Sequence, residues 1–329
     1  MGALVAGGAA LRATAHRRGW LRTARLCGPV ISVGNLSVGG SGKTPVVRRI
    51  AEILRDAGER VAILSRGYRG SFRGEALVVS DGSGPLVPAA LAGDEPVMLA
   101  RALPGVVVAV GRRRDRVGRA VEERFGRVVH LLDDGFQHLR LARDLDVVCL
   151  DVLDLADRPL PAGRLREGHR ALDRAQVVLL TRLEAASEEE LAALEERLGR
   201  DRTHRVSRRV LGFRAVDGHP APRPRSAFVL AAIARPERVV RDVLGAGTAV
   251  AGRSFYRDHH TFSAAEVEDA VARARAAGAD AVVTTAKDAV RLEGLPAAGL
   301  PVLVLEVEAA IADEARLRAR LLAAAGRPA

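Results

Sequence analysis

The fold of this chain is decided by Val30-Ile-Ser-Val-Gly-Asn-Leu-Ser-Val-Gly-Gly-Ser-Gly-Lys43-Thr44-Pro45. An apolar run leads into a glycine-rich turn, and a pattern typical of a helix follows. The backbone N–H groups of such a turn, together with the positive end of the helix dipole, bind phosphate. The segment therefore predicts a buried strand, a phosphate-binding loop and a helix, in that order.

The residues of this turn also predict a divalent cation. In the pattern G-x-x-x-x-G-K-[ST], the lysine reaches the β- and γ-phosphates of a nucleotide and the last hydroxyl binds Mg²⁺. These roles fall to Lys43 and Thr44, although a serine stands at the first glycine position. The alternative is a chance glycine-rich turn. The predicted phosphate-binding residues are Ser37, Val38, Gly39, Gly40, Ser41, Gly42, Lys43 and Thr44.

Composition limits the classes of protein that fit. The chain has 329 residues, 48% of them hydrophobic, so we expect two domains with sizeable cores. The net charge of +11 favours an anionic partner, but the chain has only seven Phe, two Tyr and one Trp. So few aromatic rings argue against binding single-stranded nucleic acid by base stacking. The two cysteines exclude a disulfide framework and favour a reducing compartment.

The basic residues are very unevenly divided. Of 51, only Lys43 and Lys287 are lysines. Such a bias indicates compositional drift toward arginine, so the net charge overstates selection for positive charge. It also makes the two lysines informative, because a compact ammonium and a planar guanidinium are not interchangeable at tight phosphate sites.

Apolar runs without period-2 alternation lie between helical patterns, which predicts a doubly wound, mostly parallel sheet. The predicted strands are Val30–Val33, Val61–Leu64, Leu77–Val79, Val106–Val110, Val128–Leu132, Val147–Leu150 and Val177–Leu180, and the helices include Pro45–Ala57, Pro96–Leu103, Arg113–Arg124 and Glu184–Arg200. A second α/β set has strands at Phe228–Ala232, Thr248–Ala251, Ala281–Thr285 and Val302–Leu305, and helices near 236–244, 264–277 and 309–324.

Three regions are expected along the chain. Residues 1–28 form an N-terminal membrane-interface segment, residues 29–219 a P-loop domain, and residues 220–329 a smaller α/β domain. The boundary is placed at the Pro-rich stretch His219–Pro224, after a possible strand pair at Thr203–Val216.

The first 28 residues contain five arginines, no acidic residue and Trp20. No apolar run is long enough to span a bilayer, and an apolar stretch followed by arginines and Trp suits a helix in the headgroup region. A helix packed on the domain is the main alternative. A signal peptide is a weaker one, because no basic region precedes the apolar part.

Acidic residues follow two of the predicted strands. Asp133 and Asp134 come after Val128–Leu132, as at a metal site of the Walker B type, and Asp151 after Val147–Leu150 is a competitor. Adjacent strand residues point in opposite directions, so geometry favours one of the pair as the metal ligand. Solvated acids at the end of a strand are the alternative.

Four polar segments have both a structural and a functional interpretation. Gly93-Asp94-Glu95-Pro96 could be a helix start with Glu95 as N-cap and Pro96 at N1, or could supply a carboxylate base. Arg257-Asp258-His259-His260 could be a polar loop before a helix capped by Ser263, or a proton-transfer or metal site. Ser65–Arg73 resembles an anion-binding loop, whereas Gly111–Arg116 is interpreted as a solvated basic face.

Together these segments resemble the tetraacyldisaccharide 4'-kinase family. The matching stretches occur in the family's order and cover residues 30–290. They are Val33–Pro45, Ser65–Tyr68, Gly93–Pro96, Leu132–His138, Arg143–Asp146, Leu160–Glu167, Asp258–His259 and Thr284–Asp288. The chain departs from the family pattern at Arg164 and Gly168, where Pro is usual, and in the second histidine of the doublet, His260.

The resemblance implies transfer of the γ-phosphoryl of ATP to the 4'-hydroxyl of an acylated glucosamine disaccharide 1-phosphate at the cytoplasmic face of the inner membrane. It implies Asp94 as the base, assisted by His259, and Lys43 as a further catalytic residue. Mg²⁺ is assigned to Thr44, Asp133, Asp134 and Glu167, and the substrate to Arg66, Tyr68, Gln137 and Arg166.

Two other classes of protein fit part of the pattern. A P-loop NTPase acting as a switch or chaperone would need no lipid acceptor, and a nucleic-acid-binding ATPase fits the charge but not the scarcity of rings. We therefore expect ATP and Mg²⁺, a lipid acceptor at a membrane surface, no nucleic acid and no obligate protein partner.

Overall fold

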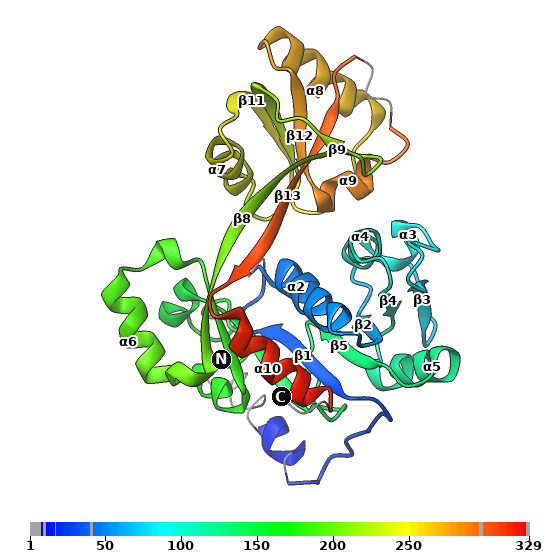
Figure 1. Cartoon of the computed structure of the whole chain (residues 1–329), viewed down its shortest axis with the longest axis vertical. Coiled ribbons are helices and arrows are strands. Elements are labelled where there is room, and N and C mark those ends of the chain that lie inside the picture. Colours follow the sequence, from blue (N-terminus) through cyan, green and yellow to red (C-terminus); the bar gives the residue numbers. More distant parts are fainter. Residues whose placement is uncertain (1–7, 9–10, 17, 40–41, 296–298, 327–329) are drawn as a thin grey trace. The chain divides into compact units, whose positions relative to one another are not determined.

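The computed structural model describes residues 8, 11–16, 18–39, 42–295 and 299–326. The chain forms two compact units (Figure 1). The first unit comprises Met1–Ser207 and Ala309–Ala329, and the second comprises Arg208–Glu308. Residues 1–7, 9–10 and 17 of the predicted membrane-interface segment, and Gly40 and Ser41 of the predicted phosphate loop, lie outside the described residues.

The first unit is built on a mostly parallel sheet in the order β8-β7-β6-β1-β5-β2-β4-β3. Between neighbours in this order, the described pairings are parallel except that of β3 with β4. The prediction of a doubly wound α/β sheet is confirmed. The strands are β1 Val30–Asn35, β2 Val61–Ser65, β3 Leu77–Ser80, β4 Val107–Val110, β5 Val129–Asp133, β6 Leu145–Asp151, β7 Val177–Thr181 and β8 Thr203–Ala215.

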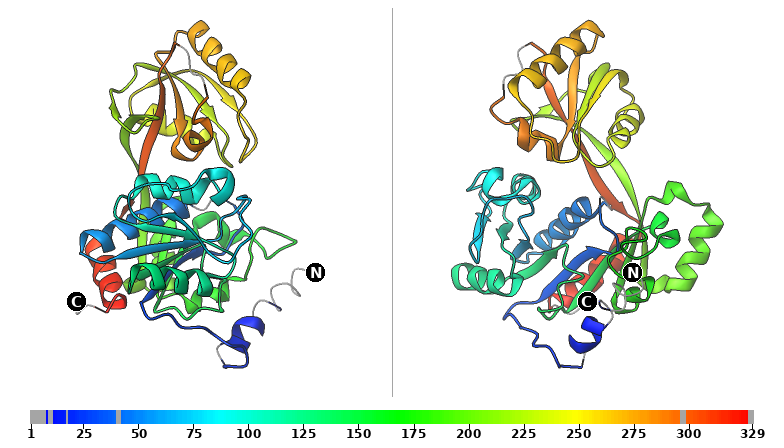
Figure 2. Two further views of the ribbon diagram at one scale, coloured as in Figure 1. Left: turned by 90° about the vertical axis from the view of Figure 1, so that its right-hand side faces the viewer. Right: turned by 180° about the vertical axis from the view of Figure 1, so that it is seen from behind.

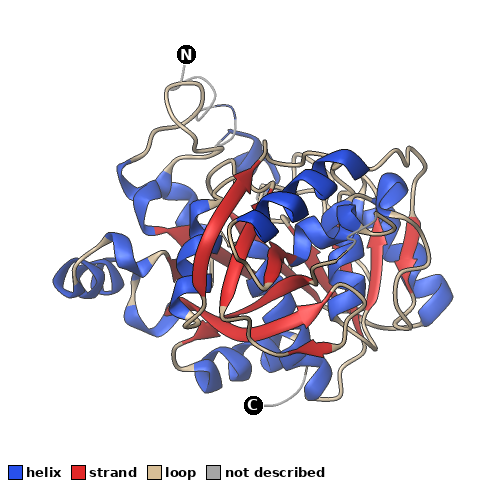
Figure 3. Ribbon diagram, turned by 90° about the horizontal axis from the view of Figure 1, so that it is seen from above, coloured by secondary structure: helices blue, strands red, loops and turns tan. Residues whose placement is uncertain are grey.

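Helices cover both faces of this sheet, which explains why its strands are continuously apolar. α2 packs on β1, β2 and β5 and lies beside α10, as Figures 1 and 2 show. α5 packs through Val117 and Val121 against a cluster that includes Ala62 and Val107. The helices of the unit, drawn in blue in Figure 3, include α2 Lys43–Asp56, α3 Ala89–Ala92, α4 Asp94–Ala102, α5 Arg114–Phe125, α6 Glu188–Leu198 and α10 Glu314–Ala324.

Strand β1 lies between β5 and β6, and this position organises the first unit. Its register pairs Val33 with Asp133 of β5 and Asn35 with Cys149 of β6. The carboxyl ends of parallel strands meet at one edge of the sheet. The end of β1 therefore brings the glycine-rich loop beside the aspartates that end β5, in the way that open α/β sheets form ligand sites.

The second unit has its own parallel strands, in the order β11-β10-β12-β13, continued by β8 and the short β9. Hydrophobic clusters around Phe228 and Val229 form its core. Its elements are β9 Pro220–Ala221, β10 Ser226–Ala231, α7 Glu237–Gly245, β11 Ala249–Phe255, α8 Ala264–Ala276, β12 Ala281–Thr285, α9 Ala286–Leu292 and β13 Val302–Ile311.

The boundaries of the units differ from the expected ones. The second unit begins at Arg208 and ends at Glu308, so residues 309–329 belong to the first unit rather than to a C-terminal domain. The stretch Thr203–Val216 holds one long strand, β8, whose middle residues are exposed. The boundary falls within the exposed part of this strand, so a strand and not a Pro-rich loop connects the units here. The Pro-rich stretch supplies β9, which pairs back on β8.

The last element also differs from expectation. The helix expected near 309–324 begins only at Glu314, because residues up to Ile311 continue β13. Arg49 of α2 donates from Nε to a Glu314 oxygen at 2.7 Å, which ties α10 to the helix that follows the loop. Within the part of the chain that the structure describes, no helix is both long and apolar enough to cross a membrane.

Gly34 in β1 is a position where the backbone approaches its neighbour closely. A Cβ there would lie 2.5 Å from Cβ and 2.8 Å from the backbone nitrogen of Phe136. We expect Gly34→Ala to lower the free energy of unfolding by about 1–3 kcal/mol, because an overpacked core must shift backbone. Chemical denaturation measures this loss.

Gly168→Ala is the matched control. A Cβ at Gly168 meets no atom within 4 Å, and the residue has a φ of −69° that any residue adopts. Its unfolding free energy should stay within about 0.5 kcal/mol of the original. Equal stability of the two variants would show that the β1–Phe136 approach can relax without cost.

Candidate active site

The glycine-rich turn leads directly into α2. Gly42 is the N-cap residue with φ of 79°, a left-handed conformation that favours glycine, and Lys43 and Thr44 are the first two residues of the helix. Gly39 also has a positive φ of 109°. Both lie in the turn that was predicted to bind phosphate, and the described part has the strand–turn–helix form that this prediction requires.

Lys43 joins the ends of two neighbouring strands. Its Nζ donates to Oδ1 of Asn35, the last residue of β1, at 2.8 Å. The same nitrogen forms an ion pair with Asp134, the residue after β5, at 2.8 Å. An ammonium group is thus held at the carboxyl edge of the sheet, at the start of the helix that follows the turn.

Asp133 and Asp134 have different surroundings. Asp133 ends β5, is buried and accepts a hydrogen bond from the Ser65 hydroxyl at 3.0 Å. Burial raises the pKa of Asp133, and the charge of Asp134 raises it further. Asp134 has φ of 54°, which ends the strand and turns its side chain toward Lys43.

The pKa of Asp134 is shifted in the opposite direction. Burial acts to raise its pKa, but Lys43 and Arg166 together outweigh that effect and hold the pKa at about 2. The Asp134 carboxylate is therefore ionised at neutral pH. The left-handed turn at Asp134 gives the two aspartates different partners.

Two further predicted residues complete a ring of polar contacts. Arg166 donates to Asp134 at 2.8 Å and lies 3.4 Å from Oε1 of Gln137. The Gln137 amide donates to the carbonyl of Asn35 at 2.9 Å, and Arg166 donates from its backbone to Leu36 at 2.6 Å. The structure thus brings Lys43, Asp134, Gln137 and Arg166 together.

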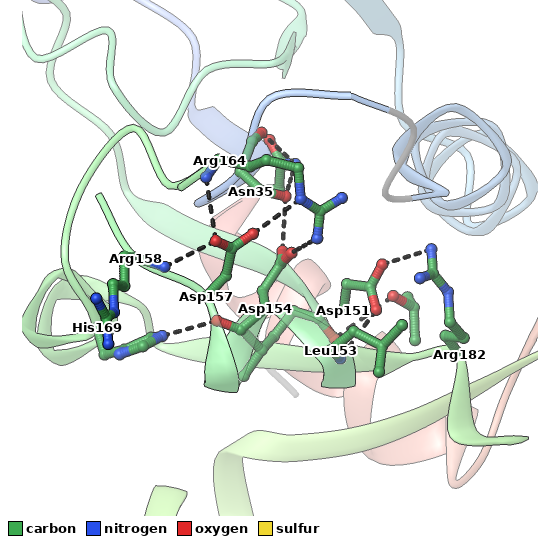
Figure 4. A network of polar contacts seen from close by, with 12 residues as sticks. Asn35, Asp151, Leu153, Asp154, Asp157, Arg158, Arg164, His169 and Arg182 are labelled. Carbon is green, nitrogen blue, oxygen red and sulfur yellow. Dashed lines mark hydrogen bonds and ion pairs between the residues drawn. The ribbon is translucent and has the colours of Figure 1, made fainter. Parts of the chain in front are cut away.

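A network of polar contacts holds the start of the loop (Figure 4). The Ser37 hydroxyl donates to Asp154 at 2.6 Å, and both residues are buried. Arg164 contacts the other oxygen of Asp154 at 3.3 Å, and its Nε donates to Asp157 at 2.8 Å. The serine at the first glycine position therefore turns its side chain into the protein.

Asp151, the competing acid after β6, is already paired. Its carboxylate lies 2.6 Å from a guanidinium nitrogen of Arg182, as Figure 4 shows, and it accepts from the backbone of Leu153 at 3.1 Å. Asp151 caps the turn that follows its strand, and the arginine offsets its charge. These contacts favour Asp133 and Asp134 over Asp151 as the acids of the site.

Glu167, predicted as a metal ligand, is engaged by Arg174 through both oxygens, at 2.9 and 3.0 Å. Among the described residues, no three His, Cys, Asp or Glu side chains converge on one metal position. Mg²⁺ is usually held by one or two carboxylates together with substrate phosphates and water. Asp133, Asp134 and Thr44 fit such a site, because a divalent cation would offset the repulsion between the two aspartates.

Two predicted motifs are joined by close backbone approaches. A Cβ on Gly70 would lie 2.9 Å from the nitrogen of Gly93, and a Cβ on Gly93 would lie 2.5 Å from the carbonyl oxygen of Tyr68. The loop after β2 therefore packs on the start of α4, where Asp94 is the first residue and half-buried. Ser65, which precedes this loop, contacts Asp133. The loop therefore links Asp133 to the start of α4, where Asp94 lies.

The helix cap predicted here is wrong. The N-cap is Gly93, with φ of 94°, and not Glu95, because α4 already begins at Asp94. Pro96 is then the third helical residue, a position where its missing N–H costs nothing. Arg66 and Tyr68 of the neighbouring loop are exposed, and the guanidinium of Arg69 lies over the Tyr68 ring at 5.8 Å.

One residue of the site was missed in the sequence. The Gly111–Arg116 cluster was interpreted as a solvated face, and this is wrong for Arg114, which is only 5% exposed. Burial lowers its pKa, while the charges of Asp133 and Asp134 oppose that shift. Nothing in the arginine-rich sequence separates Arg114 from its exposed neighbours. Its place at the start of α5, directly after β4, is the one available signal.

The histidine doublet lies in the second unit, and its two members have different partners. His260 stacks on Tyr256 with ring centroids 4.6 Å apart and pairs with Glu266 at 2.9 Å. Glu266 belongs to the capping box of α8 with Ser263, as predicted. His259 has φ of 66° and lies between two cationic side chains. His260 is thus used in packing, which favours His259 for chemistry.

The strand, glycine-rich turn and helix, with Lys43 facing an aspartate at the end of the adjacent strand, define a P-loop nucleotide-binding protein of the phosphotransferase class. The chain belongs to the tetraacyldisaccharide-1-P 4'-kinase family, whose model matches residues 1–326.

Individual relatives agree with this assignment. The tetraacyldisaccharide 4'-kinase of Anaeromyxobacter dehalogenans strain 2CP-1 is 46% identical over 306 residues, which cover 88% of this chain and 79% of the relative. The tetraacyldisaccharide 4'-kinase of Geobacter metallireducens is 42% identical over 286 residues, which cover 86% of this chain and 84% of the relative. The crystal structure of the "apo" form of LpxK from Aquifex aeolicus in complex with ATP superposes with a TM-score of 0.80 at 30% sequence identity. The match covers 98% of this chain and 96% of the Aquifex chain.

Removing the Lys43 ammonium should remove phosphoryl transfer. We expect Lys43→Ala to lower turnover by about 10²–10³-fold or more, because the charge that would stabilise the transferring phosphoryl group is lost. The protein should stay folded, since Arg166 still pairs with Asp134. Lys43→Arg should also be impaired, since a planar fork does not fit the point-charge site between Asn35 and Asp134. Steady-state kinetics with a thermal melt of each variant measures both effects. Near-normal turnover in folded Lys43→Ala protein would overturn the assignment of the loop.

Proposed function

We propose that this chain transfers the γ-phosphoryl group of ATP to the 4'-hydroxyl of an acylated glucosamine disaccharide 1-phosphate. The observation that carries the proposal is the position of Lys43 at the head of α2, within 2.8 Å of both Asn35 and Asp134. Family membership supports the acceptor, and a relative that is in complex with ATP supports the donor.

The chain's own cations stabilise the charge on the transferring group. Lys43 and Arg166 both pair with Asp134. These contacts fix the two positive charges beside the position proposed for the phosphates. Preorganised charge of this kind is the largest single contribution to most phosphoryl transfers. Bound Mg²⁺ supplies further charge neutralisation on the phosphoryl oxygens, with Thr44, Asp133 and Asp134 as the residues that would hold it.

Asp94 acts as the general base, with His259 assisting. The 4'-hydroxyl proton passes to the Asp94 carboxylate as the sugar oxygen bonds to phosphorus. The bond from phosphorus to the bridging oxygen breaks at the same time, and ADP leaves. Support comes from the half-buried position of Asp94 at the start of α4, beside the loop that reaches Asp133 through Ser65. Such help is worth about 10²–10⁴-fold.

The acceptor is bound by Arg66, Tyr68, Gln137 and Arg166. Arg66 and Tyr68 stand exposed on the loop that packs on Gly93, where a ring and a guanidinium can meet a sugar and its phosphate. Gln137 and Arg166 lie in the ring of contacts around Asp134. The four residues come from both sides of the acidic pair.

Transfer of labelled phosphate tests the function. The purified chain is incubated with γ-labelled ATP, Mg²⁺ and lipid disaccharide 1-phosphate in detergent, and label in the lipid fraction is measured against a sample without lipid. Label in the lipid supports a kinase. ADP release that is indifferent to the lipid but responds to a protein or to nucleic acid would point instead to a switch or a motor.

The base assignment has its own test. Asp94→Asn keeps the size of the side chain and removes the basic carboxylate, so we expect kcat to fall by about 10²–10⁴-fold with little change in KM for ATP. Kinetics at saturating lipid, with a thermal melt as control, measures the change. A lower thermal midpoint with unchanged kcat would leave Asp94 a structural residue of the helix start.

We further propose that the N-terminal segment binds the membrane surface and keeps the enzyme peripheral, at the cytoplasmic face of the inner membrane. Trp20 and Leu11 are each 66% exposed, and the Arg18 guanidinium lies 5.3 Å over the Trp20 ring. Exposed apolar side chains with arginines suit an anionic headgroup layer. No nucleic acid and no obligate protein partner is part of the proposal.

Deleting residues 1–25 should weaken binding to anionic vesicles and lower activity on lipid presented in vesicles more than on lipid in detergent. Each arginine near the surface contributes about 1 kcal/mol, and high salt should release the full-length protein only in part, since the apolar contribution is not screened. Vesicle sedimentation of both proteins measures this. Equal binding would place the lipid contact on the folded units.

A further inference from the structure

The second lysine of the chain is in an unusual position. In a sequence with 51 basic residues, Lys287 and Lys43 are the two lysines. Lys43 has an evident reason to be a lysine, because the loop requires a compact charge. The question is what Lys287, in α9 of the second unit, does that an arginine would not.

Lys287 contacts the Asp258–His259 pair directly. Its Nζ donates to Oδ1 of Asp258 at 3.0 Å and lies 3.0 Å from Nε2 of His259. One helical turn later, Arg291 places a guanidinium nitrogen 3.2 Å from Nδ1 of the same imidazole. Residues four apart lie on one face of a helix, so α9 presents a cation to each ring nitrogen.

Further hydrogen bonds support this arrangement. Asp288 is fully buried and accepts from the backbone of Ala232 at 3.1 Å and from the Thr285 hydroxyl that caps α9 at 2.8 Å. The backbone of His259 donates to the carbonyl of Ala232 at 3.1 Å. The start of α9 and His259 are therefore both hydrogen-bonded to Ala232, the residue after β10.

The partners constrain the protonation of the ring. Ammonium and guanidinium groups only donate hydrogen bonds, so a ring nitrogen can accept from one of them only where it carries a lone pair, and a neutral imidazole has one such nitrogen. A doubly protonated imidazole offers none, and two cations at this distance oppose a third positive charge. The Asp258 carboxylate, 3.8 Å from Nε2, acts in the opposite direction but is itself paired with Lys287. The arrangement therefore favours the neutral ring, and the shorter contact from Lys287 favours Nε2 as the nitrogen without a proton.

We propose that Lys287 is a positioning residue that orients the imidazole of His259 and keeps it neutral, with Nε2 as acceptor. The proposal rests on the proposed function, in which His259 assists the base. A single Nζ bridges Asp258 Oδ1 and His259 Nε2, a task for a point charge that a planar fork with fixed donor directions cannot reproduce. The retained lysine is thereby explained.

Four variants test the proposal: Lys287→Met, Lys287→Arg, His259→Ala and the double variant Lys287→Met/His259→Ala. Because misorientation of an assisting group costs about 10²-fold, we expect each Lys287 variant to lower kcat by that order. KM for ATP and the thermal midpoint should stay near their original values. The double variant should be no slower than His259→Ala, since Lys287 acts through His259.

The control variant is Arg241→Met, which removes an exposed charge of the same unit on α7. Its kcat should equal that of the original chain. Wild-type kcat in Lys287→Arg, or losses that multiply in the double variant, would overturn the proposal. So would full activity in His259→Ala, which leaves the assignment of Lys43 untouched.

A spectroscopic readout separates this proposal from the proposed function. Nitrogen NMR of ¹⁵N-histidine-labelled protein shows which ring nitrogen carries the proton, and the spectrum of His259→Ala identifies the signals of His259 among the eight histidines. We expect a neutral ring with an unprotonated Nε2 in the original chain at pH 6.5, and loss of that signature in Lys287→Met. Unchanged signals would overturn the positioning role, even if the enzyme phosphorylates lipid. Conversely, if the chain phosphorylates no lipid, the expected NMR signals would still support the contact between Lys287 and His259.

Discussion

The site depends on the contacts of the Lys43 ammonium group with Asn35 and Asp134. These contacts connect the end of β1, the start of α2 and the residue after β5, three segments far apart in the sequence. A partly buried cation is stable only beside a compensating charge. Since Val33 and Asp133 are in register, the contact forms only once the sheet is assembled, and Arg166 and Gln137 then close around it.

The local parts of this arrangement could be predicted from the sequence, and the long-range parts could not. The glycine-rich turn, with an apolar run before it and Lys43 after it, fixes strand, loop and helix through local chemistry. Which strands flank β1 is a matter of pairing between distant segments. The predicted boundary between the units is wrong for the same reason, because β8 itself runs from one unit into the other and α10 packs on α2 of the first unit.

The chemistry of the site divides in a similar way. Alternation along a strand separates Asp133 from Asp134, but the left-handed turn that gives Asp134 to Lys43 is not visible in the sequence. Arg114 is buried beside the acidic pair, while its neighbours in the same basic run are exposed. In an arginine-rich chain only the fold tells them apart. His259 and His260 likewise differ only through their partners, cations for one and a stacked ring for the other.

Two departures from expected patterns are explained by one buried carboxylate. Ser37 replaces the first glycine of the nucleotide-binding pattern, and Arg164 stands where the family usually has proline. Both side chains contact Asp154, at 2.6 and 3.3 Å (Figure 4). Burial raises the pKa of Asp154, and the hydrogen bond from Ser37 opposes that shift. The backbone adds Val38 N to Arg164 O at 2.8 Å. The Ser37 hydroxyl thus joins the start of the loop to the segment that carries Arg166.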